Sequence, residues 1–425
     1  MNILFLSQIV PYPPHGGVLQ RGYNILREIG RHNRVHLLAF LHPDTLSTPA
    51  LVDESLEELG KHCATVLYFP LWPKRSTIHK LAAFGAGLLY PLPFSVMAHR
   101  STAYRNAVRE ITDSRSIDLL HIDTIGLAPY RTLAPRIPCA LTHHNIESRL
   151  MERRAETEDN MIRKFYTNLQ TKRLRSYEKE QSVLFDMNIV VSSTDQADLC
   201  RIAPGAAAHV IPNGVDTSYF SPGTDNHEIS AIYTGGMNMY ANKDAVLYFV
   251  RDIWPTILRS HPGAKFYAIG QDPPRELKDH ASRDQSIIVT GFVDDVRPYV
   301  KKSAVYVVPL RVGGGTRLKV LDALAQGKAI VSTSVGCEGI AVTHEKDILI
   351  EDQPDQFAAR VSALFSDFVM RRQLGIAARR LAVSRYDWSA IGEDLHNLYK
   401  NIVELRRSGI LPSVKRPRTD EGYQQ

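Results

Sequence analysis

The residues best suited to chemistry lie between Pro309 and Ile340, in the segment PLRVGGGTRLKVLDALAQGKAIVSTSVGCEGI. An apolar strand at 304–308 precedes three glycines, and Thr316 follows at a position typical of a helix N-cap. Gly327 stands where a helix stop is expected, and a second apolar strand follows at 329–332. This order predicts a βαβ unit whose loop lies at the carboxyl end of a strand, where open α/β sheets bind ligands.

The loop of this unit carries groups suited to binding a phosphate. Glycines let the backbone approach a ligand, and a helix start offers unpaired N–H groups with partial positive charge. Arg317 and Lys319 add two cations at the same place. Asp322 lies three residues after Lys319, on the same helical face and about 4.5 Å further along the helix axis, where it would accept hydrogen bonds from a ribose. The alternative is a plain glycine turn in which Lys319 and Asp322 pair as surface charges.

Two further glycine pairs follow predicted strands. Gly16 and Gly17 come after a strand at 2–6 and precede an amphipathic helix at about 18–30. Gly235 and Gly236 come after a strand at 231–234. Each pair alone is equally consistent with an ordinary turn, but three glycine loops after strands favour repeated ligand contacts.

Polar residues also follow two strands of the N-terminal half. His121 and Asp123 end a strand at 119–122, and His143 and His144 end the next at 140–142. A carboxylate at this edge would accept a proton or stabilise a developing positive charge, although a helix-capping aspartate is an equally good explanation. Because no third ligand stands near the histidine pair, we predict no metal site.

The composition describes an ordinary globular chain. Its 425 residues are 44% hydrophobic and 23% charged, and its four cysteines are widely spaced. We expect reduced cysteines and a cytoplasmic protein, because MNILFLSQIV reads as a strand and not as a signal peptide. The net charge of +6 favours anionic partners.

Apolar runs separated by helical patterns continue through both halves, with a Pro/Gly/Asp-rich linker at 220–227. This alternation predicts two α/β domains with mostly parallel sheets.

The most apolar stretch, 76–100, is interrupted by Pro91 and Pro93, so we read it as a buried helix with a loop or as an interfacial helix on anionic lipid. A charged helix or helix pair at 151–184 has no acid between Ile162 and Tyr177, which gives either a solvated face or a surface directed at a membrane. No aromatic interleaving supports nucleic-acid binding.

Four segments of the sequence resemble the family 4 glycosyltransferases. They are 210–222 (VIPNGVDTSYFSP), 234–237, Gly291-Phe292-Val293, and above all 313–339. The resemblance implies a GT-B fold, an α/β architecture of two Rossmann-like domains that face each other across a cleft. The expected parts are an N-terminal acceptor-binding domain at 1–220, a C-terminal nucleotide-sugar-binding domain at 228–385, a helix crossing back at 386–407 and a flexible tail at 408–425.

The resemblance also assigns roles, with two departures from the family pattern. Asp322 matches the second acid of the E-x7-E motif, but the first acid falls at Gly314. The basic positions of the second glycine loop fall near Met237 and Asn242, so Arg317 and Lys319 would carry the phosphate charge. The residues expected to bind the nucleotide-sugar are Gly16, Gly17, Gly235, Gly236, Val293, Gly314, Gly315, Thr316, Arg317, Leu318, Lys319 and Asp322. The catalytic candidates are Asp123, which aligns with the family's active-site histidine, His144 and Arg317.

The function implied is a retaining transfer of sugar from a UDP- or GDP-sugar to a hydroxyl acceptor, without a metal or other cofactor. The expected acceptor is a glycan or a lipid-linked polysaccharide precursor, with peripheral contact to an anionic membrane. Another GT-B enzyme, such as a phosphorylase or sugar-nucleotide epimerase, and a non-catalytic nucleotide-sugar-binding module remain as alternatives.

Overall fold

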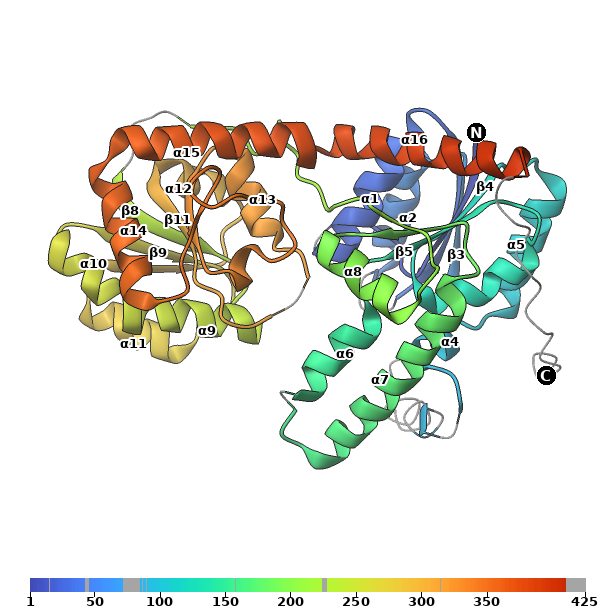
Figure 1. The fold of residues 1–425 in the computed structure, drawn as a ribbon, viewed down its shortest axis with the longest axis horizontal. Helices are drawn as coiled ribbons and strands as arrows, with labels where there is room; N and C mark the ends of the chain where they lie inside the picture. Colours follow the sequence, from blue (N-terminus) through green and yellow to red (C-terminus); the bar gives the residue numbers. More distant parts are fainter. Residues whose placement is uncertain are drawn as a thin grey trace. The chain divides into compact units, whose positions relative to one another are not determined.

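The chain forms two compact units, described here in turn (Figure 1). The computed structural model describes residues 1–14, 16–42, 46–71, 85, 87–88, 90–156, 158–223, 228–313 and 315–409. The N-terminal unit comprises Met1–Pro212 and Ile391–Gln425, and the C-terminal unit comprises Asn213–Ala390. The N-terminal unit is therefore built from two separate stretches of sequence.

The N-terminal unit is built on a parallel sheet with the strand order β3-β2-β1-β4-β5-β6-β7. The strands are β1 Asn2–Ser7, β2 Arg34–Leu41, β3 Thr65–Pro70, β4 Leu119–Ile122, β5 Cys139–His143, β6 Met187–Val190 and β7 Ala208–Val210. The helices are α1 Gly17–Gly30, α2 Pro49–Gly60, α4 Phe94–Ala98, α5 Thr102–Ser114, the 3-10 helix η1 Ile125–Leu133, α6 Glu147–Glu156, α7 Met161–Ser182, α8 Ser193–Ile202 and, in large part, α16 Trp388–Arg407. Every residue of β4 and β5 is buried, as expected of central parallel strands covered on both faces.

The C-terminal unit repeats this plan with the strand order β10-β9-β8-β11-β12-β13, again parallel. The strands are β8 Glu228–Thr234, β9 Lys265–Ile269, β10 Ile287–Gly291, β11 Ser303–Val308, β12 Ala329–Ser332 and β13 Leu349–Ile350. The helices are α9 Tyr240–Tyr248, the π-helix η2 Phe249–Ile253, α10 Trp254–Ser260, α11 Arg275–Arg283, α12 Arg297–Lys302, α13 Leu318–Ala325, the 3-10 helix η3 Val335–Cys337, α14 Pro354–Ser366, α15 Phe368–Leu381 and the π-helix η4 Ala382–Tyr386. In both units the sheet order reverses direction beside a strand that a glycine loop follows, which is where such sheets bind ligands.

The strands expected from the apolar runs are confirmed, with ends that differ by no more than a few residues. The charged segment at 151–184 forms a helix pair, α6 and α7. Most of the apolar stretch at 76–100 and the tail from 410 onward lie outside the described residues. Among the residues that are described, no helix combines the length and the apolar character needed to cross a membrane.

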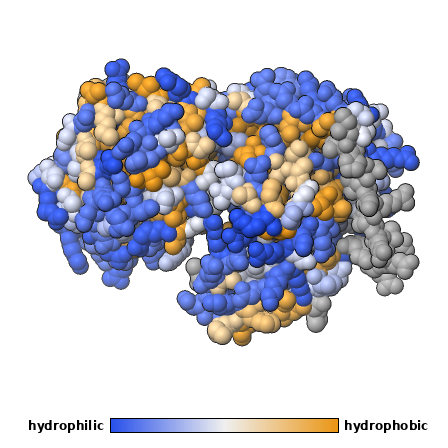
Figure 2. Space-filling model, viewed as in Figure 1, coloured by the Kyte–Doolittle hydropathy of each residue, from blue (hydrophilic) through white to orange (hydrophobic). Residues whose placement is uncertain are grey.

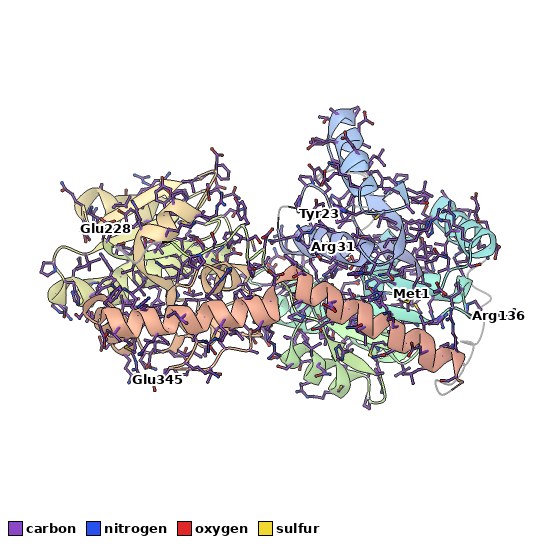
Figure 3. The ribbon with its side chains drawn as sticks, turned by 90° about the horizontal axis from the view of Figure 1, so that it is seen from above. Met1, Tyr23, Arg31, Arg136, Glu228 and Glu345 are labelled. Atoms are coloured by element: carbon purple, nitrogen blue, oxygen red, sulfur yellow. The ribbon has the colours of Figure 1, made fainter. Side chains whose placement is uncertain are left out.

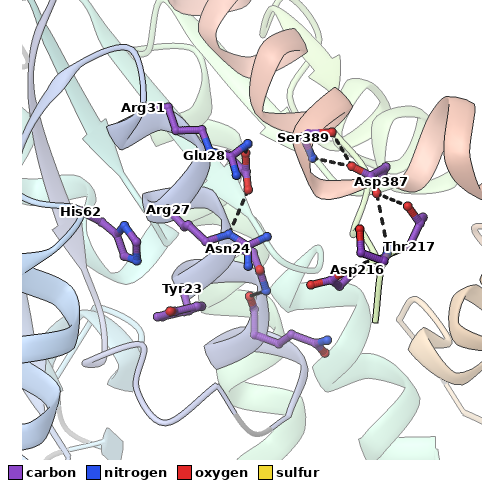
Figure 4. Close-up of polar contacts among 12 residues, drawn as sticks. Tyr23, Asn24, Arg27, Glu28, Arg31, His62, Asp216, Thr217, Asp387 and Ser389 are labelled. Atoms are coloured by element: carbon purple, nitrogen blue, oxygen red, sulfur yellow. Dashed lines mark hydrogen bonds and ion pairs between the residues drawn. The ribbon is translucent and has the colours of Figure 1, made fainter. Parts of the chain in front are cut away.

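The helix α16 packs against α1 within the N-terminal unit, as the view from above shows (Figure 3). A Cβ added at Gly392 would collide with the side chain of Glu28, and His396 Nδ1 lies 3.0 Å from Asn33 Nδ2. At its other end, the start of α16 is fixed within the C-terminal unit, where Asp387 accepts hydrogen bonds from the backbone N–H of Ser389, at 2.9 Å, and from Thr217 (Figure 4).

The helix α13 is fixed at its carboxyl end by one arginine. Arg379 Nη1 donates to the carbonyl oxygens of Ala325, Thr217 and Phe220 at 2.6, 3.0 and 2.9 Å. Gly327, which has a φ of 64°, ends the helix as predicted. The backbone after Gly327 packs closely against α15, because a Cβ added at Gly375 would collide with the Gly327 carbonyl oxygen.

We expect Gly375→Ala to lower the free energy of unfolding of the C-terminal unit by about 1–3 kcal/mol, because the added methyl group has no room. Gly263→Ala is the matched control, since a Cβ at that position meets no atom within 4 Å. Denaturant melts of both variants measure the difference. Equal stability of the two variants would show that α13 and α15 are not tightly packed at Gly327.

Candidate functional site

The centre of the candidate site in the C-terminal unit is the ammonium group of Lys319. Lys319 Nζ donates to the hydroxyl of Tyr233 and to Asn242 Oδ1, at 2.8 Å each, and lies 4.2 Å from the centre of the Tyr233 ring. Asn242 Nδ2 in turn donates to the carbonyl oxygen of Gly236 at 2.7 Å. A side chain from the start of α13 therefore bonds to the loop that follows β8, and two glycine loops are joined through one cation.

This bond brings a basic side chain to a position where the chain departs from the family pattern. The resemblance places a basic residue near Asn242, where the sequence has an amide. The ammonium of Lys319 reaches that amide from another loop. A positive charge therefore stands beside the Gly235–Gly236 loop although the residues expected to supply it are absent.

Lys319 and the nearby Asp322 both have shifted pKa values. Burial, reinforced by repulsion from Arg317, lowers the pKa of Lys319 to about 7, and attraction to Asp322 opposes the shift. Burial also raises the pKa of Asp322 to about 7, against the attraction of Lys319. Arg317 is half-buried, and its Nη1 donates to the Gly315 carbonyl oxygen at 2.8 Å. The two cations and the carboxylate predicted from the sequence therefore share one partly desolvated region.

The glycines of these loops allow close approach of other groups. A Cβ at Gly235 would collide with Lys319 Nζ, and a Cβ at Gly270 would collide with the Gly235 carbonyl oxygen. Gly236 and the exposed Gly313 belong to the same two loops, and Gly315 has a φ of 80°, a conformation that favours glycine. Gly314 lies outside the described residues.

The predicted helix cap at Thr316 is wrong. The N-cap position of α13 is Arg317, whose side chain bonds to the preceding loop and leaves the helix start without a side-chain cap. The cap shifts because Gly315, with its positive φ, turns the chain so that the helix begins only at Leu318. The Thr316 hydroxyl is buried and has no hydrogen-bond partner among the described residues, so it is available to a ligand.

Two other predicted binding residues lie beside this region with different surroundings. Leu318 is half-buried and packs against the apolar core of the unit, which makes its side chain structural. Val293 also packs against that core, whereas the preceding Phe292 is 70% exposed. Sequence reasoning did not select Phe292, although an exposed aromatic residue directly after a strand could have indicated a surface for a base.

The N-terminal unit brings together its two catalytic candidates. His144 Nε2 lies 3.1 Å from Asp123 Oδ1, and the Ser7 hydroxyl donates to Asp123 Oδ2 at 3.4 Å. The helix-capping alternative for Asp123 is wrong, because Thr124 occupies the cap position of η1 and uses no side-chain bond. A carboxylate in this position fixes the orientation of the imidazole, so the pair is suited to proton transfer or to stabilising positive charge.

The other two histidines near this pair are structural. His121 stacks on Phe5 and bonds through Nδ1 to the Tyr399 hydroxyl at 2.6 Å, and burial lowers its pKa to about 3. His143 Nε2 lies 3.0 Å from Asn188 Oδ1, and burial lowers its pKa to about 4. Both rings are therefore neutral at physiological pH and hold the strand ends that carry Asp123 and His144.

Arg21 has contacts that could not be predicted from the sequence. This arginine follows the Gly16–Gly17 loop and is 1% exposed, and its guanidinium donates to the carbonyl oxygens of Ile211 and Pro212 at 2.8 and 2.7 Å. Burial lowers its pKa, and attraction to Asp123 opposes that shift. Gly16 has a φ of 93°, and a Cβ there would meet no atom within 4 Å, so the loop backbone is open to a ligand.

Metal binding was not predicted, and the part of the chain that the structure describes contains no group of three or more histidine, cysteine or acidic side chains arranged to hold an ion. The candidate residues thus form two sets, one on each unit. The set on the C-terminal unit offers cations and glycine loops for a phosphate, and the set on the N-terminal unit offers a carboxylate with an imidazole.

Two family models match the chain. "Glycosyltransferase Family 4" matches residues 16–219, and "Glycosyl transferases group 1" matches residues 228–367. An uncharacterised 44.6 kDa protein from the cps region of Klebsiella pneumoniae is 20% identical over 91% of this chain and 96% of its own length. The phosphatidyl-myo-inositol mannosyltransferase of Mycobacterium tuberculosis is 26% identical over 47% of this chain and 56% of its own length.

The fold matches known structures over almost the whole chain. Anabaena HepE, solved in complex with UDP, superposes with a TM-score of 0.65 at 15% identity, over 94% of this chain and all of that one. The predicted GT-B class of α/β fold is thereby confirmed.

A pH dependence follows from the position of Lys319. Above about pH 7 the unliganded protein loses the proton of Lys319, whereas a bound diphosphate favours the ammonium form. The affinity for inorganic pyrophosphate of the wild type relative to Lys319→Arg should therefore fall as the pH rises above 7, by up to about tenfold per pH unit, since arginine stays charged. Calorimetric titration of both proteins across this range measures the ratio. A ratio that does not change with pH would show that Lys319 does not bind the phosphates.

Proposed function

Because the chain belongs to the family 4 glycosyltransferases, which have the GT-B fold, we propose that it transfers a sugar from a UDP- or GDP-sugar to a hydroxyl acceptor with retention of anomeric configuration. The observation that carries this proposal is the position of Lys319 Nζ. Lys319 belongs to α13, the helix that follows the Gly313–Gly315 loop, and its Nζ bonds to Asn242 beside the Gly235–Gly236 loop. Family membership also favours this proposal over the phosphorylase, epimerase and non-catalytic alternatives.

In the proposed reaction the C-terminal unit stabilises the leaving nucleoside diphosphate. Negative charge develops on the β-phosphate as the glycosidic bond breaks, and Arg317, Lys319 and the Thr316 hydroxyl are the groups that would meet it. Asp322 lies on the same helix and is suited to the ribose. Ionised Asp322 accepts hydrogen bonds and protonated Lys319 attracts phosphate, so donor binding is best near pH 7, where both forms coexist.

The proposed role of the N-terminal unit is to act on the sugar and the acceptor. The pair of Asp123 and His144 would stabilise positive charge at the anomeric carbon or receive the proton of the acceptor hydroxyl. No metal or other cofactor is part of this proposal.

The proposed acceptor is a lipid-linked or cell-surface polysaccharide precursor. Two relatives support this class: one is named for a phosphatidyl-inositol acceptor, and the other lies in a cps region. The basic character of the chain is consistent with phosphate-bearing acceptors.

The function is tested by thermal shift with UDP-, GDP- and ADP-sugars, followed by a transfer assay with the donor that binds. We expect one uridine or guanosine donor to raise the unfolding temperature, because a ligand that binds the native state stabilises it. The matching nucleoside diphosphate should appear only when an acceptor is present or as slow hydrolysis. Stabilisation by none of these donors, or turnover that requires inorganic phosphate, would overturn the proposal.

Arg317→Ala should lower the transfer rate about 100-fold, the cost of removing one charged contact to a developing negative charge, while the fold survives. Arg251→Ala is the matched control, because Arg251 is exposed and pairs with Glu276 at 3.6 Å. Steady-state rates and circular dichroism of both variants supply the comparison. Wild-type turnover in Arg317→Ala would remove Arg317 from the mechanism.

A further inference from the structure

The tip of the α6–α7 hairpin exposes three large apolar side chains in the first turns of α7. Met161 is 79% exposed, Ile162 is 71% exposed and Phe165 is 67% exposed. Single exposed apolar residues are common on protein surfaces, but three within five residues are not. Figure 2 shows hydrophobic residues gathered at the free end of this hairpin, which extends away from the rest of the N-terminal unit in Figure 1.

The helical spacing places the three residues on one side of α7. Asn160 caps the helix, accepting hydrogen bonds from the N–H groups of Ile162 and Arg163 at 3.1 Å each. At about 100° per residue, Met161, Ile162 and Phe165 fall within an arc of about 100°. Arg163 and Lys164 fall on either side of that arc, so the apolar group has a basic margin.

The base of the hairpin is bonded to neighbouring backbone, whereas Met161, Ile162 and Phe165 at its tip are exposed among the residues that the structure describes. Gln170 Nε2 donates to the Gly87 carbonyl oxygen at 2.8 Å, and Arg173 Nη2 donates to the Leu88 carbonyl oxygen at 2.9 Å. Glu178 accepts the backbone N–H of Ser148 at 3.2 Å, which joins the two helices. The hairpin therefore presents its exposed side chains on a fixed support.

The charge around the tip favours an anionic surface. Between Arg153 and Arg175 the sequence has seven basic and three acidic residues. One of the three acids, Glu158, is bonded to the backbone N–H of Asn160 at 3.1 Å. A second copy of the same tip would bring like charges together, which disfavours pairing of two hairpins.

We propose that the α6–α7 tip docks on a bilayer that contains anionic phospholipid, with Met161, Ile162 and Phe165 entering the interface and Arg163 and Lys164 meeting the headgroups. Interfacial binding of this kind scales with buried apolar area and with attraction to anionic lipid. The inference does not depend on the proposed donor chemistry, since binding to a membrane is measured without a donor.

The test is flotation with vesicles of phosphatidylcholine alone and of phosphatidylcholine mixed with phosphatidylglycerol. We expect the wild-type protein to bind the mixed vesicles, and to bind less as salt is added. The combined variant Met161→Ser, Ile162→Ser and Phe165→Ser should bind at least about tenfold more weakly, because the apolar contacts are lost. The circular dichroism spectrum and the unfolding temperature of this variant should equal those of the wild type, which shows that it is folded.

Two further variants separate the contributions. Arg163→Glu with Lys164→Glu should remove the preference for phosphatidylglycerol. Val369→Ser with Ile376→Ser, which removes side chains that are 61% and 51% exposed on α15, is the matched control and should bind vesicles as the wild type does. The proposal is overturned if the wild type ignores vesicles, if the serine variant still binds them, or if the serine changes abolish self-association instead of vesicle binding.

Discussion

The structure of the C-terminal unit depends on placing a lysine ammonium where water is largely excluded. Lys319 Nζ has a tyrosine hydroxyl, an amide oxygen and an aromatic ring as neighbours, and none of these is a full negative charge. The cost of burial is visible in its lowered pKa. A cation held in this way gains from an anionic ligand, because attraction to Asp322 offsets only part of the cost of burial and Arg317 adds to that cost.

The N-terminal unit shows the opposite arrangement, a polar pair supported by neutral groups. His121 and His143 are buried and uncharged, and they fix the ends of two adjacent strands. Asp123 and His144 follow those strand ends and keep their mutual contact. The two units are therefore suited to different charges. The C-terminal unit offers cations suited to an anionic leaving group, and the N-terminal unit offers a pair suited to positive charge or to a proton.

Hydrophobic periodicity and the positions of glycine and proline predicted the strands, the three glycine loops and the helix stop at Gly327. These features depend on residues that are close together in the sequence. The pairing of Asp123 with His144 could be expected from the rule that parallel strands end at one edge. The cap at Thr316 was wrong because a positive φ at Gly315 delays the helix. The burial of Arg21 and the bond from Lys319 to Asn242 could not be predicted, because each depends on where distant segments pack.

The division of the N-terminal unit into two stretches has a consequence for synthesis. The second stretch of the N-terminal unit begins at Ile391, within α16. This helix supplies the Tyr399 hydroxyl that bonds to His121. During translation, residues 213–390 are synthesised before this helix. The contiguous C-terminal unit is therefore able to fold before the N-terminal unit is complete. The stretch Met1–Pro212 therefore stays incompletely covered until the segment that begins at Ile391 has been synthesised.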